Sequence, residues 1–190
     1  MNKDYWQNRY LDEQTGWDIG EASTPIRAYF DAVTNKKANI LIPGCGNAHE
    51  AAHLWQSGFE NVYLCDWAAA PLKQFANTYP DFPKAQLLEA DFFELEGQYD
   101  YIVEQTFFCA LPPERRADYA QKMPTLLAPN GKLVGLLFGI DFERVGPPFG
   151  GNRQEYLTLF EPLFSSVQIA PCHNSIPPRQ GSELFIELEK

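Results

Sequence analysis

The sequence lacks the features that identify several large classes of protein. Its longest apolar stretch, Leu133 to Ile140, is far shorter than the ~20 residues that a membrane-spanning helix needs. The N-terminus has no basic segment followed by an apolar one, the pattern of a secretory signal. No repeat or low-complexity segment is present, and the content of 45% hydrophobic and 21% charged residues is typical of a globular protein. We therefore expect a single domain, residues 1–190, in the cytoplasm and without a membrane partner.

Positive charge is also scarce. Lysine and arginine number 15 against 25 aspartates and glutamates, which gives a formal net charge of −10. An excess of negative charge repels phosphate backbones and anionic lipids. We expect no nucleic-acid partner and a small-molecule substrate instead. The oligomeric state stays open, and a monomer is compatible with the sequence.

Signals for disulfides and metals are missing too. The chain has four cysteines without a C-x-x-C pair or a zinc-ligand spacing: Cys45, Cys65, Cys109 and Cys172. His49 and His53 are four residues apart, but no H-E-x-x-H pattern surrounds them. We expect reduced, structural thiols, no metal site, and two solvated histidines on a helix.

What the sequence does contain is a regular alternation of strand and helix patterns. Strands are predicted at 39–43, 61–66, 85–90, 99–105, 132–138, 167–172 and 183–189. Helices are predicted at 47–56 with Asn47 as its cap, from Pro71 to 79, at 113–127 and at 153–160. Such alternation predicts a Rossmann-like α/β domain: a mostly parallel seven-stranded sheet with helices on both faces. The last two strands have no helix between them, which predicts an antiparallel C-terminal edge.

The first predicted strand ends in a glycine loop, Gly44-Cys45-Gly46, where doubly wound sheets bind ligands. A dinucleotide fingerprint requires a third glycine, and position 49 is histidine. Asp66 ends the second strand, where a carboxylate accepts hydrogen bonds from ribose hydroxyls. Asp91 and Phe92 follow the third strand. These features favour a cofactor with an adenosine but no pyrophosphate; the alternative is a generic turn with solvated acids.

Several segments, in order along the chain, resemble one known family. They are Trp6-x3-Tyr10-x6-Trp17-Asp18-x-Gly20, Leu41 to Gly46, Ala90-Asp91-Phe92-Phe93, Tyr99 to Leu111 with its F-F-C-A run, Pro113-x-x-Arg116, and Gly146-Pro147-Pro148-Phe149. Together they are similar to the thiopurine S-methyltransferase family of class I S-adenosylmethionine-dependent methyltransferases, in particular its thiol/halide branch. The chain departs from that branch at Tyr10, where tryptophan is usual, and at Glu104-Gln105, where an Asp-Tyr pair is common.

The resemblance implies S-adenosylmethionine as cofactor and a small thiol as methyl acceptor, with hydrosulfide, a halide or a thiopurine as alternatives. It implies that the following residues surround the cofactor: Trp6, Tyr10, Trp17, Gly44, Cys45, Gly46, Asp66, Asp91, Phe92, Glu104 and Gln105. Methyl transfer to a thiolate needs an apolar pocket and no strong base, because a free thiol is partly ionised at neutral pH. Candidates for the acceptor pocket are Phe107, Phe108, Phe149 and Arg179, although core packing and a solvated loop charge are the simpler alternatives.

The N-terminal residues 1–20 precede the α/β core, residues 37–190, and carry three large aromatic side chains. Trp6 and Tyr10 share one face of a predicted short helix, and Trp17 follows a turn. We expect a lid whose rings attract a sulfonium; the alternative is a helix that caps the core. Two other functions remain open from sequence: an NAD-dependent dehydrogenase on the same sheet, and a non-catalytic cofactor-binding protein.

Overall fold

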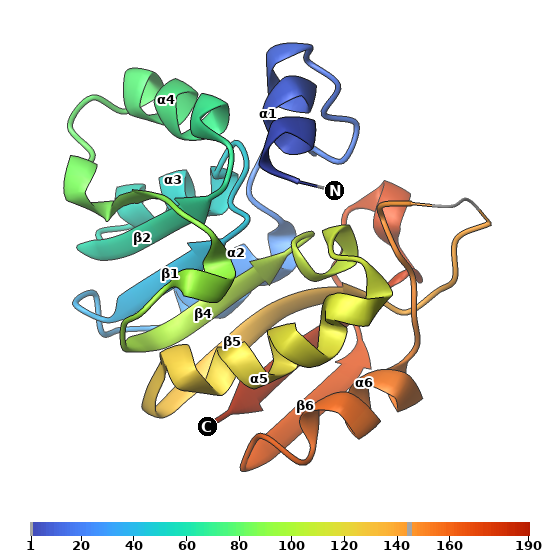
Figure 1. Ribbon diagram of the computed structural model, residues 1–190. Coiled ribbons are helices and arrows are strands. Elements are labelled where there is room, and N and C mark those ends of the chain that lie inside the picture. The colour runs from blue at the N-terminus through green and yellow to red at the C-terminus, as the bar shows by residue number, and fades with distance from the viewer. Residues whose placement is uncertain (1, 144–145) are drawn as a thin grey trace.

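The computed structural model describes residues 2–143 and 146–190 and shows one sheet between two layers of helices (Figure 1). The sheet has seven strands in the order β3-β2-β1-β4-β5-β7-β6. Their bounds are β1 Asn39–Pro43, β2 Asn61–Asp66, β3 Leu87–Glu89, β4 Tyr99–Gln105, β5 Leu127–Phe138, β6 Ser166–Pro171 and β7 Glu183–Glu189. The order changes direction between β1 and β4, the point at which doubly wound sheets bind ligands.

Helices pack on both faces of the sheet. Their bounds are α1 Lys3–Leu11, α2 Thr24–Asp31, α3 His49–Gln56, α4 Ala69–Thr78, α5 Arg116–Leu126 and α6 Arg153–Phe160. Short 3-10 segments lie at Lys84–Gln86, Phe92–Glu94, Phe108–Ala110, Pro113–Arg115 and Pro177–Arg179. Helices α2, α3 and α4 share one core with the sheet, and α5 and α6 share the other.

Successive strand residues point into opposite cores, which explains why the central strands are apolar throughout. In β1, Leu41 packs in the core with α5 and α6, whereas Ile40 and Ile42 pack in the core with α2, α3 and α4. In β4 the same alternation separates Ile102 from Val103. Parallel strands covered on both faces have this composition. The predicted antiparallel edge is confirmed, because β7 runs antiparallel to both β5 and β6.

The local predictions are wrong in three places. Asn47 does not cap α3, because Ala48 is the N-cap residue and the Asn47 side chain donates a hydrogen bond to Asp18. Strand β5 begins at Leu127 rather than Lys132, since the chain pairs with β4 across a register shift. Helix α2, which buries Ile26 and Phe30, was not predicted.

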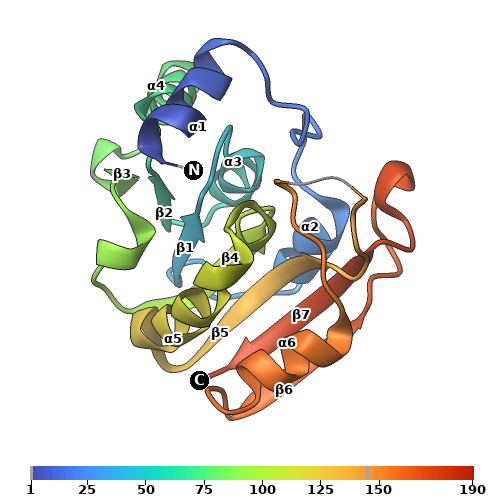
Figure 2. The ribbon, with the colours of Figure 1, turned by 45° about the vertical axis from the view of Figure 1, so that its right-hand side comes forward.

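Helix α1 lies outside both cores, beside α4 (Figures 1 and 2). None of its residues is buried. Two polar contacts attach it to α4 and β3: the Ala70 N–H donates to Gln7 Oε1 at 3.1 Å, and Lys3 pairs with Glu89 at 2.6 Å. In the described part of the chain, no helix has the length and apolar character to cross a membrane.

Candidate functional site

The loop after β1 is tied to the end of β2 by the Asp66 carboxylate. Its Oδ2 accepts a hydrogen bond from the Gly46 N–H at 2.9 Å, and its Oδ1 accepts one from the Ala68 N–H at 2.8 Å. Burial raises the pKa of Asp66, while these backbone donors oppose the rise. Gly44 and Gly46 have φ angles of 56° and 51°, which glycine adopts without steric cost. The glycine loop and Asp66 therefore form one hydrogen-bonded unit at the switch point of the sheet.

Three cavities lie at this edge of the sheet, and we call them the first, second and third cavity. The second cavity, of about 90 Å³, opens beside Asp66. Its lining includes Asp66, Asp91, Phe92 and, from α1, Trp6. Asp91 Oδ1 accepts the N–H of Phe93 at 2.9 Å, which fixes the turn after β3. Apolar walls with two carboxylates at the edge suit a nucleoside, whose base stacks on rings and whose hydroxyls donate hydrogen bonds.

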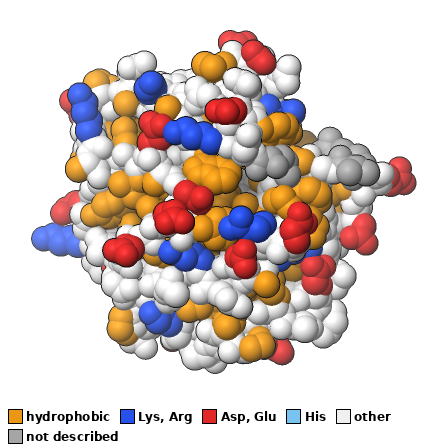
Figure 3. Space-filling view, viewed as in Figure 1, with side chains coloured by type: hydrophobic (Ala, Val, Ile, Leu, Met, Phe, Trp, Pro, Cys, Tyr) orange, Lys and Arg blue, Asp and Glu red, His pale blue; other side chains and the backbone are white. Residues whose placement is uncertain are grey.

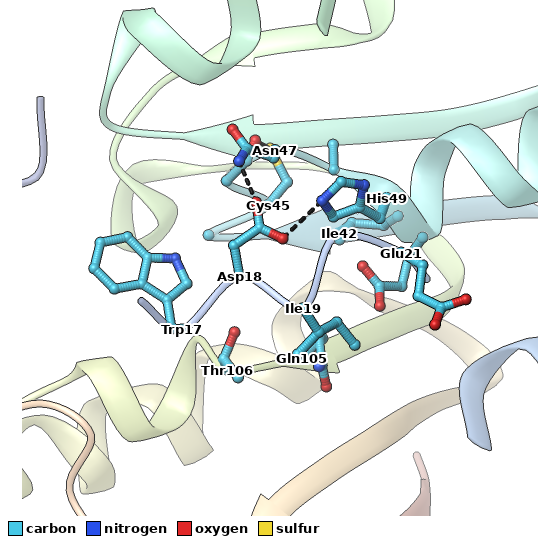
Figure 4. Close-up of a pocket in the computed structure, with 14 residues that line it drawn as sticks. Trp17, Asp18, Ile19, Glu21, Ile42, Cys45, Asn47, His49, Gln105 and Thr106 are labelled. Atoms are coloured by element: carbon cyan, nitrogen blue, oxygen red, sulfur yellow. Dashed lines mark hydrogen bonds and ion pairs between the residues drawn. The ribbon is translucent and has the colours of Figure 1, made fainter. Parts of the chain in front are cut away.

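The first cavity, about 40 Å³, lies against the glycine loop (Figure 4). Asp18 reaches into it from the N-terminal segment and accepts hydrogen bonds from the Asn47 amide and, at 2.8 Å, from His49 Nε2. The bond from His49 lowers the pKa of Asp18 to about 2, and the same bond raises the pKa of His49. The prediction that His49 is a solvated helix residue is therefore wrong. It holds the N-terminal segment against the loop.

Two residues that line this first cavity each have a buried acceptor atom without a hydrogen-bond partner: Gln105 Oε1 and Asn47 Oδ1. The carboxylates of Asp18 and Glu50 belong to the same lining. A buried acceptor is costly to leave unpaired. The cavity is therefore suited to a ligand that brings N–H donors, such as a primary ammonium group.

The turn after β4 contributes a residue to the lining of all three cavities. Thr106 lines all three cavities and has a φ of 59°, an uncommon conformation for a β-branched residue. Glu104 supports this turn, because its Oε1 accepts the N–H groups of Phe107 at 2.8 Å and Phe108 at 2.9 Å. Its Oε2 accepts the Tyr119 hydroxyl at 2.6 Å. Burial raises the pKa of Glu104 to about 7.

The third cavity, about 440 Å³, is the largest of the three. It lies between the turn after β4, the end of β5, the segment before β7, and α1. Apolar side chains, including Phe138 and Ile140, form most of its wall. Its charged lining residues are Arg9 and Arg179, and no carboxylate, imidazole or lysine is found among its described lining residues.

Most of the residues predicted to bind the cofactor line the first or second cavity: Trp6, Trp17, Gly44, Cys45, Gly46, Asp66, Asp91, Phe92 and Gln105. Tyr10 lies in front of the glycine loop, where a Cβ on Gly46 would come within 2.6 Å of its hydroxyl. Glu104, also predicted to bind the cofactor, is not among the residues that line the three cavities; its fully buried carboxylate binds the backbone of the turn.

Of the four residues predicted for the acceptor pocket, two line a cavity. Arg179 lines the third cavity, whereas Phe107 lines the second. Phe108 is 1% exposed, packs on Tyr119 in the core and is not among the residues that line these three cavities. Phe149 lies outside the linings of these three cavities, and its N–H donates to the carbonyl of Cys109 at 2.7 Å.

The aromatic side chains of the N-terminal segment form one cluster. Trp17 makes edge-to-face contacts with Trp6, at 5.5 Å between ring centroids, and with Tyr10, at 5.8 Å. Trp6 lines the second and third cavities, and Trp17 lines the first and third. The two tryptophans of the cluster therefore form a wall that is shared between the cavities beside Thr106.

The sequence profile of the thiopurine S-methyltransferase family matches residues 1–181. The chain belongs to this family. It is 30% identical over 184 residues to a probable thiol methyltransferase 2 of Arabidopsis thaliana, covering 94% of this chain and 81% of that relative. It is 31% identical over 184 residues to thiocyanate methyltransferase 1 of Brassica oleracea, with the same coverage.

Solved structures agree on the fold. A Burkholderia thailandensis 1,6-didemethyltoxoflavin-N1-methyltransferase, solved with its substrate and S-adenosylhomocysteine, superposes with a TM-score of 0.75 at 18% identity. The match covers 99% of this chain and 86% of that one. The family identifies the chain as an S-adenosylmethionine-dependent methyltransferase, a reading that the comparisons support over the dehydrogenase alternative.

The cavities fit that cofactor by their chemistry. Asp66 and Phe92 both line the second cavity, where a carboxylate suits the hydroxyls of a ribose and an aromatic ring suits an adenine. The unpaired Gln105 Oε1 in the first cavity suits the amino group of the methionine part. Sequence reasoning missed Thr106, although it directly precedes the F-F-C-A run in the segment from Tyr99 to Leu111 that carried the resemblance. It also missed the Asp18–His49 contact, which joins residues far apart in the chain and leaves no local signal.

Proposed function

We propose that the chain transfers the methyl group of S-adenosylmethionine to a thiol that binds in the third cavity. The observation that carries this proposal is the convergence of the three cavities on Thr106. A cofactor that occupied the first and second cavities would have its reactive centre near this residue. An acceptor in the third cavity then faces that centre.

The composition of the third cavity favours thiols over alcohols and amines. Its described lining holds no carboxylate, imidazole or lysine that is able to remove a proton. Burial also raises the pKa of the lining thiol of Cys109 far above its ordinary value, so this cysteine remains protonated. A thiol with an ordinary pKa near ~8.5 is partly ionised at neutral pH and needs no base, whereas an alcohol does.

The chain contributes orientation and exclusion of water. When bound, the cofactor supplies an electrophilic methyl group on a sulfonium: the thiolate lone pair forms the new sulfur–carbon bond, and the electrons of the broken bond return to the cofactor sulfur. Apolar walls remove water from the thiolate and hold it in line with the methyl group. Trp6 and Trp17 line the third cavity beside Thr106, and an aromatic face turned to a sulfonium there would stabilise it by about 0.5–2 kcal/mol.

We further propose that α1 acts as a lid. It buries no residue, belongs to neither core, and is held by the aromatic cluster, the Asp18–His49 contact and a few polar contacts. Movement of such a segment lets a cofactor enter and then closes the pocket to water.

The test is a pair of acceptors that differ in one atom, benzenethiol and phenol, with methyl-labelled S-adenosylmethionine. The proposal predicts labelled thioanisole and little or no labelled anisole. Equal or faster methylation of phenol would contradict the base-free mechanism, and no product with any thiol would overturn the proposed acceptor class.

A further inference from the structure

Charge in the third cavity is not balanced. Of its two guanidinium groups, that of Arg179 is paired: Nη1 lies 3.2 Å from Glu183 Oε1, and Nη2 donates to the Trp17 carbonyl at 2.8 Å. The Glu183 side chain is 4% exposed, so this pair is sheltered from solvent. Arg179 therefore ties the N-terminal segment to β7, and its charge is neutralised.

Arg9 of α1 has no such partner. Among residues 2–143 and 146–190 no carboxylate forms an ion pair with it, and its Nε is buried without a hydrogen-bond acceptor. The guanidinium is held by ring faces instead, with Cζ 5.5 Å from the centroid of Tyr5 and 5.4 Å from that of Trp17. A buried, unpaired donor is costly, and a planar guanidinium matches a carboxylate in two parallel hydrogen bonds.

The position of Arg9 shows which part of an acceptor it meets. Thr106, Trp6 and Trp17 line the third cavity together with another cavity and so mark the junction where methyl transfer takes place. Arg9 lines the third cavity alone. A halide or hydrosulfide carries its charge on the reacting atom, at the junction. Arg9 is not among the residues that line the first or second cavity, so an anion there fits a separate group of a larger molecule better than the reacting atom itself. The volume of about 440 Å³ is within the range of roughly 300–1,000 Å³ typical of small-molecule sites.

We propose that Arg9 binds an anionic substituent of the methyl acceptor, so that the preferred substrates are thiols with an apolar body and a carboxylate or similar group away from the sulfur. This inference rests on the proposed thiol methyltransferase function. Arg9 is a specificity residue in this scheme: it contacts the substrate but not the reacting atoms. The rest of the acidic chain would repel such an anion, and the unpaired arginine gives it one place to bind.

The experiment compares 4-mercaptobenzoate with 4-methylbenzenethiol, in which a methyl group replaces the carboxylate. Wild type is expected to have the lower KM for 4-mercaptobenzoate. Arg9→Met keeps an apolar side chain of similar length and is expected to raise the KM for 4-mercaptobenzoate by about 10- to 100-fold more than the KM for 4-methylbenzenethiol. Arg9→Lys is expected to fall between, because it keeps the charge but loses the planar fork.

Two controls separate this role from a structural one. Arg153→Met, at the start of α6, removes an arginine outside the three cavities and is expected to leave both KM values unchanged. Titration of 4-(methylthio)benzoate, which cannot react, is expected to show binding to wild type and much weaker binding to Arg9→Met.

The two proposals fail in different ways. If wild type methylates both thiols and Arg9→Met changes both KM values equally, or neither, the role of Arg9 is overturned and the proposed function stands. If wild type methylates no thiol, the proposed function fails, and the titration still decides whether Arg9 binds an anion: equal binding to wild type and variant overturns it.

Discussion

Replacing Glu104 with glutamine tests the turn that joins the cavities. Burial raises the pKa of Glu104 from its ordinary value of 4.5 to about 7 in the folded chain. Between these two values the folded state holds a proton that the unfolded state has lost. The contribution of this group to the free energy of unfolding of the wild type is therefore expected to fall as pH rises from about 4.5 to about 7, and to stay constant above that window.

The size of the effect follows from the shift. Each pKa unit corresponds to about 1.4 kcal/mol, so a shift from 4.5 to about 7 gives on the order of 3 kcal/mol. Glu104→Gln keeps the same shape: its amide oxygen accepts the Phe107 and Phe108 N–H groups, and its amide nitrogen donates to the Tyr119 oxygen. The variant is expected to become the more stable protein relative to wild type as pH rises.

The assay is urea unfolding of both proteins from about pH 4 to about pH 8. Glu161→Gln, on the exposed C-terminal end of α6, controls for the loss of one negative charge. Titrations common to all three proteins cancel in the differences. A difference between wild type and Glu104→Gln that is constant with pH would refute the account of a buried carboxylate with a raised pKa.

Three further predictions concern the cofactor side and the lid. Asp66→Asn is expected to weaken S-adenosylmethionine binding by at least about 10-fold in calorimetry, because charge-assisted hydrogen bonds are worth about 1.5–3 kcal/mol each; an unchanged Kd would remove Asp66 from the site. Asp18→Asn is expected to lower the pKa of His49, measured by NMR, because the acceptor that raises this pKa loses its charge. In wild type the Asp18–His49 contact is strongest below the His49 pKa and weakens as pH rises through that pKa. An unchanged His49 pKa in the variant would contradict the contact. Deletion of residues 2–20 is expected to leave cooperative unfolding, with weak cofactor binding and poor turnover; full activity would contradict the lid, and outright unfolding would favour a helix that caps the core.

The sheet was predictable because its signals are local. Each central strand is a short apolar run bounded by glycine, proline or a charged residue, and burial on both faces makes such runs conspicuous. Helix α2 was missed although Pro25 in its first turn and the pair Ile26 and Phe30 were visible signals. The early start of β5 was hidden by Asn130-Gly131, which reads as a turn between elements but lies within the strand at a register shift.

The cofactor side of the site was predictable for a related reason. Glycines and acids at the ends of parallel strands converge at one edge of the sheet whatever the rest of the chain does. The acceptor side was not, because it depends on contacts between distant segments. Glu104 reads as a strand-end acid near a ligand, and its burial against Tyr119 appears only in the fold. Arg9 becomes notable only once Arg179 is found paired with Glu183.

The surface agrees with a small-molecule substrate. On the face seen in Figure 3, lysine and arginine side chains are scattered among aspartates and glutamates rather than gathered in a stripe. Proteins that bind nucleic acid non-specifically present clustered positive charge to the phosphate backbone. On this face the charges form no such cluster.

The most direct test of the central claim is the crystal structure of the chain with S-adenosylhomocysteine and 4-(methylthio)benzoate. The account predicts the ribose hydroxyls on Asp66 in the second cavity, the amino group beside Gln105 in the first, and the cofactor sulfur at Thr106 facing the third. The benzoate derivative is predicted in the third cavity with its sulfur toward Thr106. A cofactor bound with its sulfur turned away from Thr106, or with its adenosine in the third cavity, would contradict the convergence on which the proposed function rests.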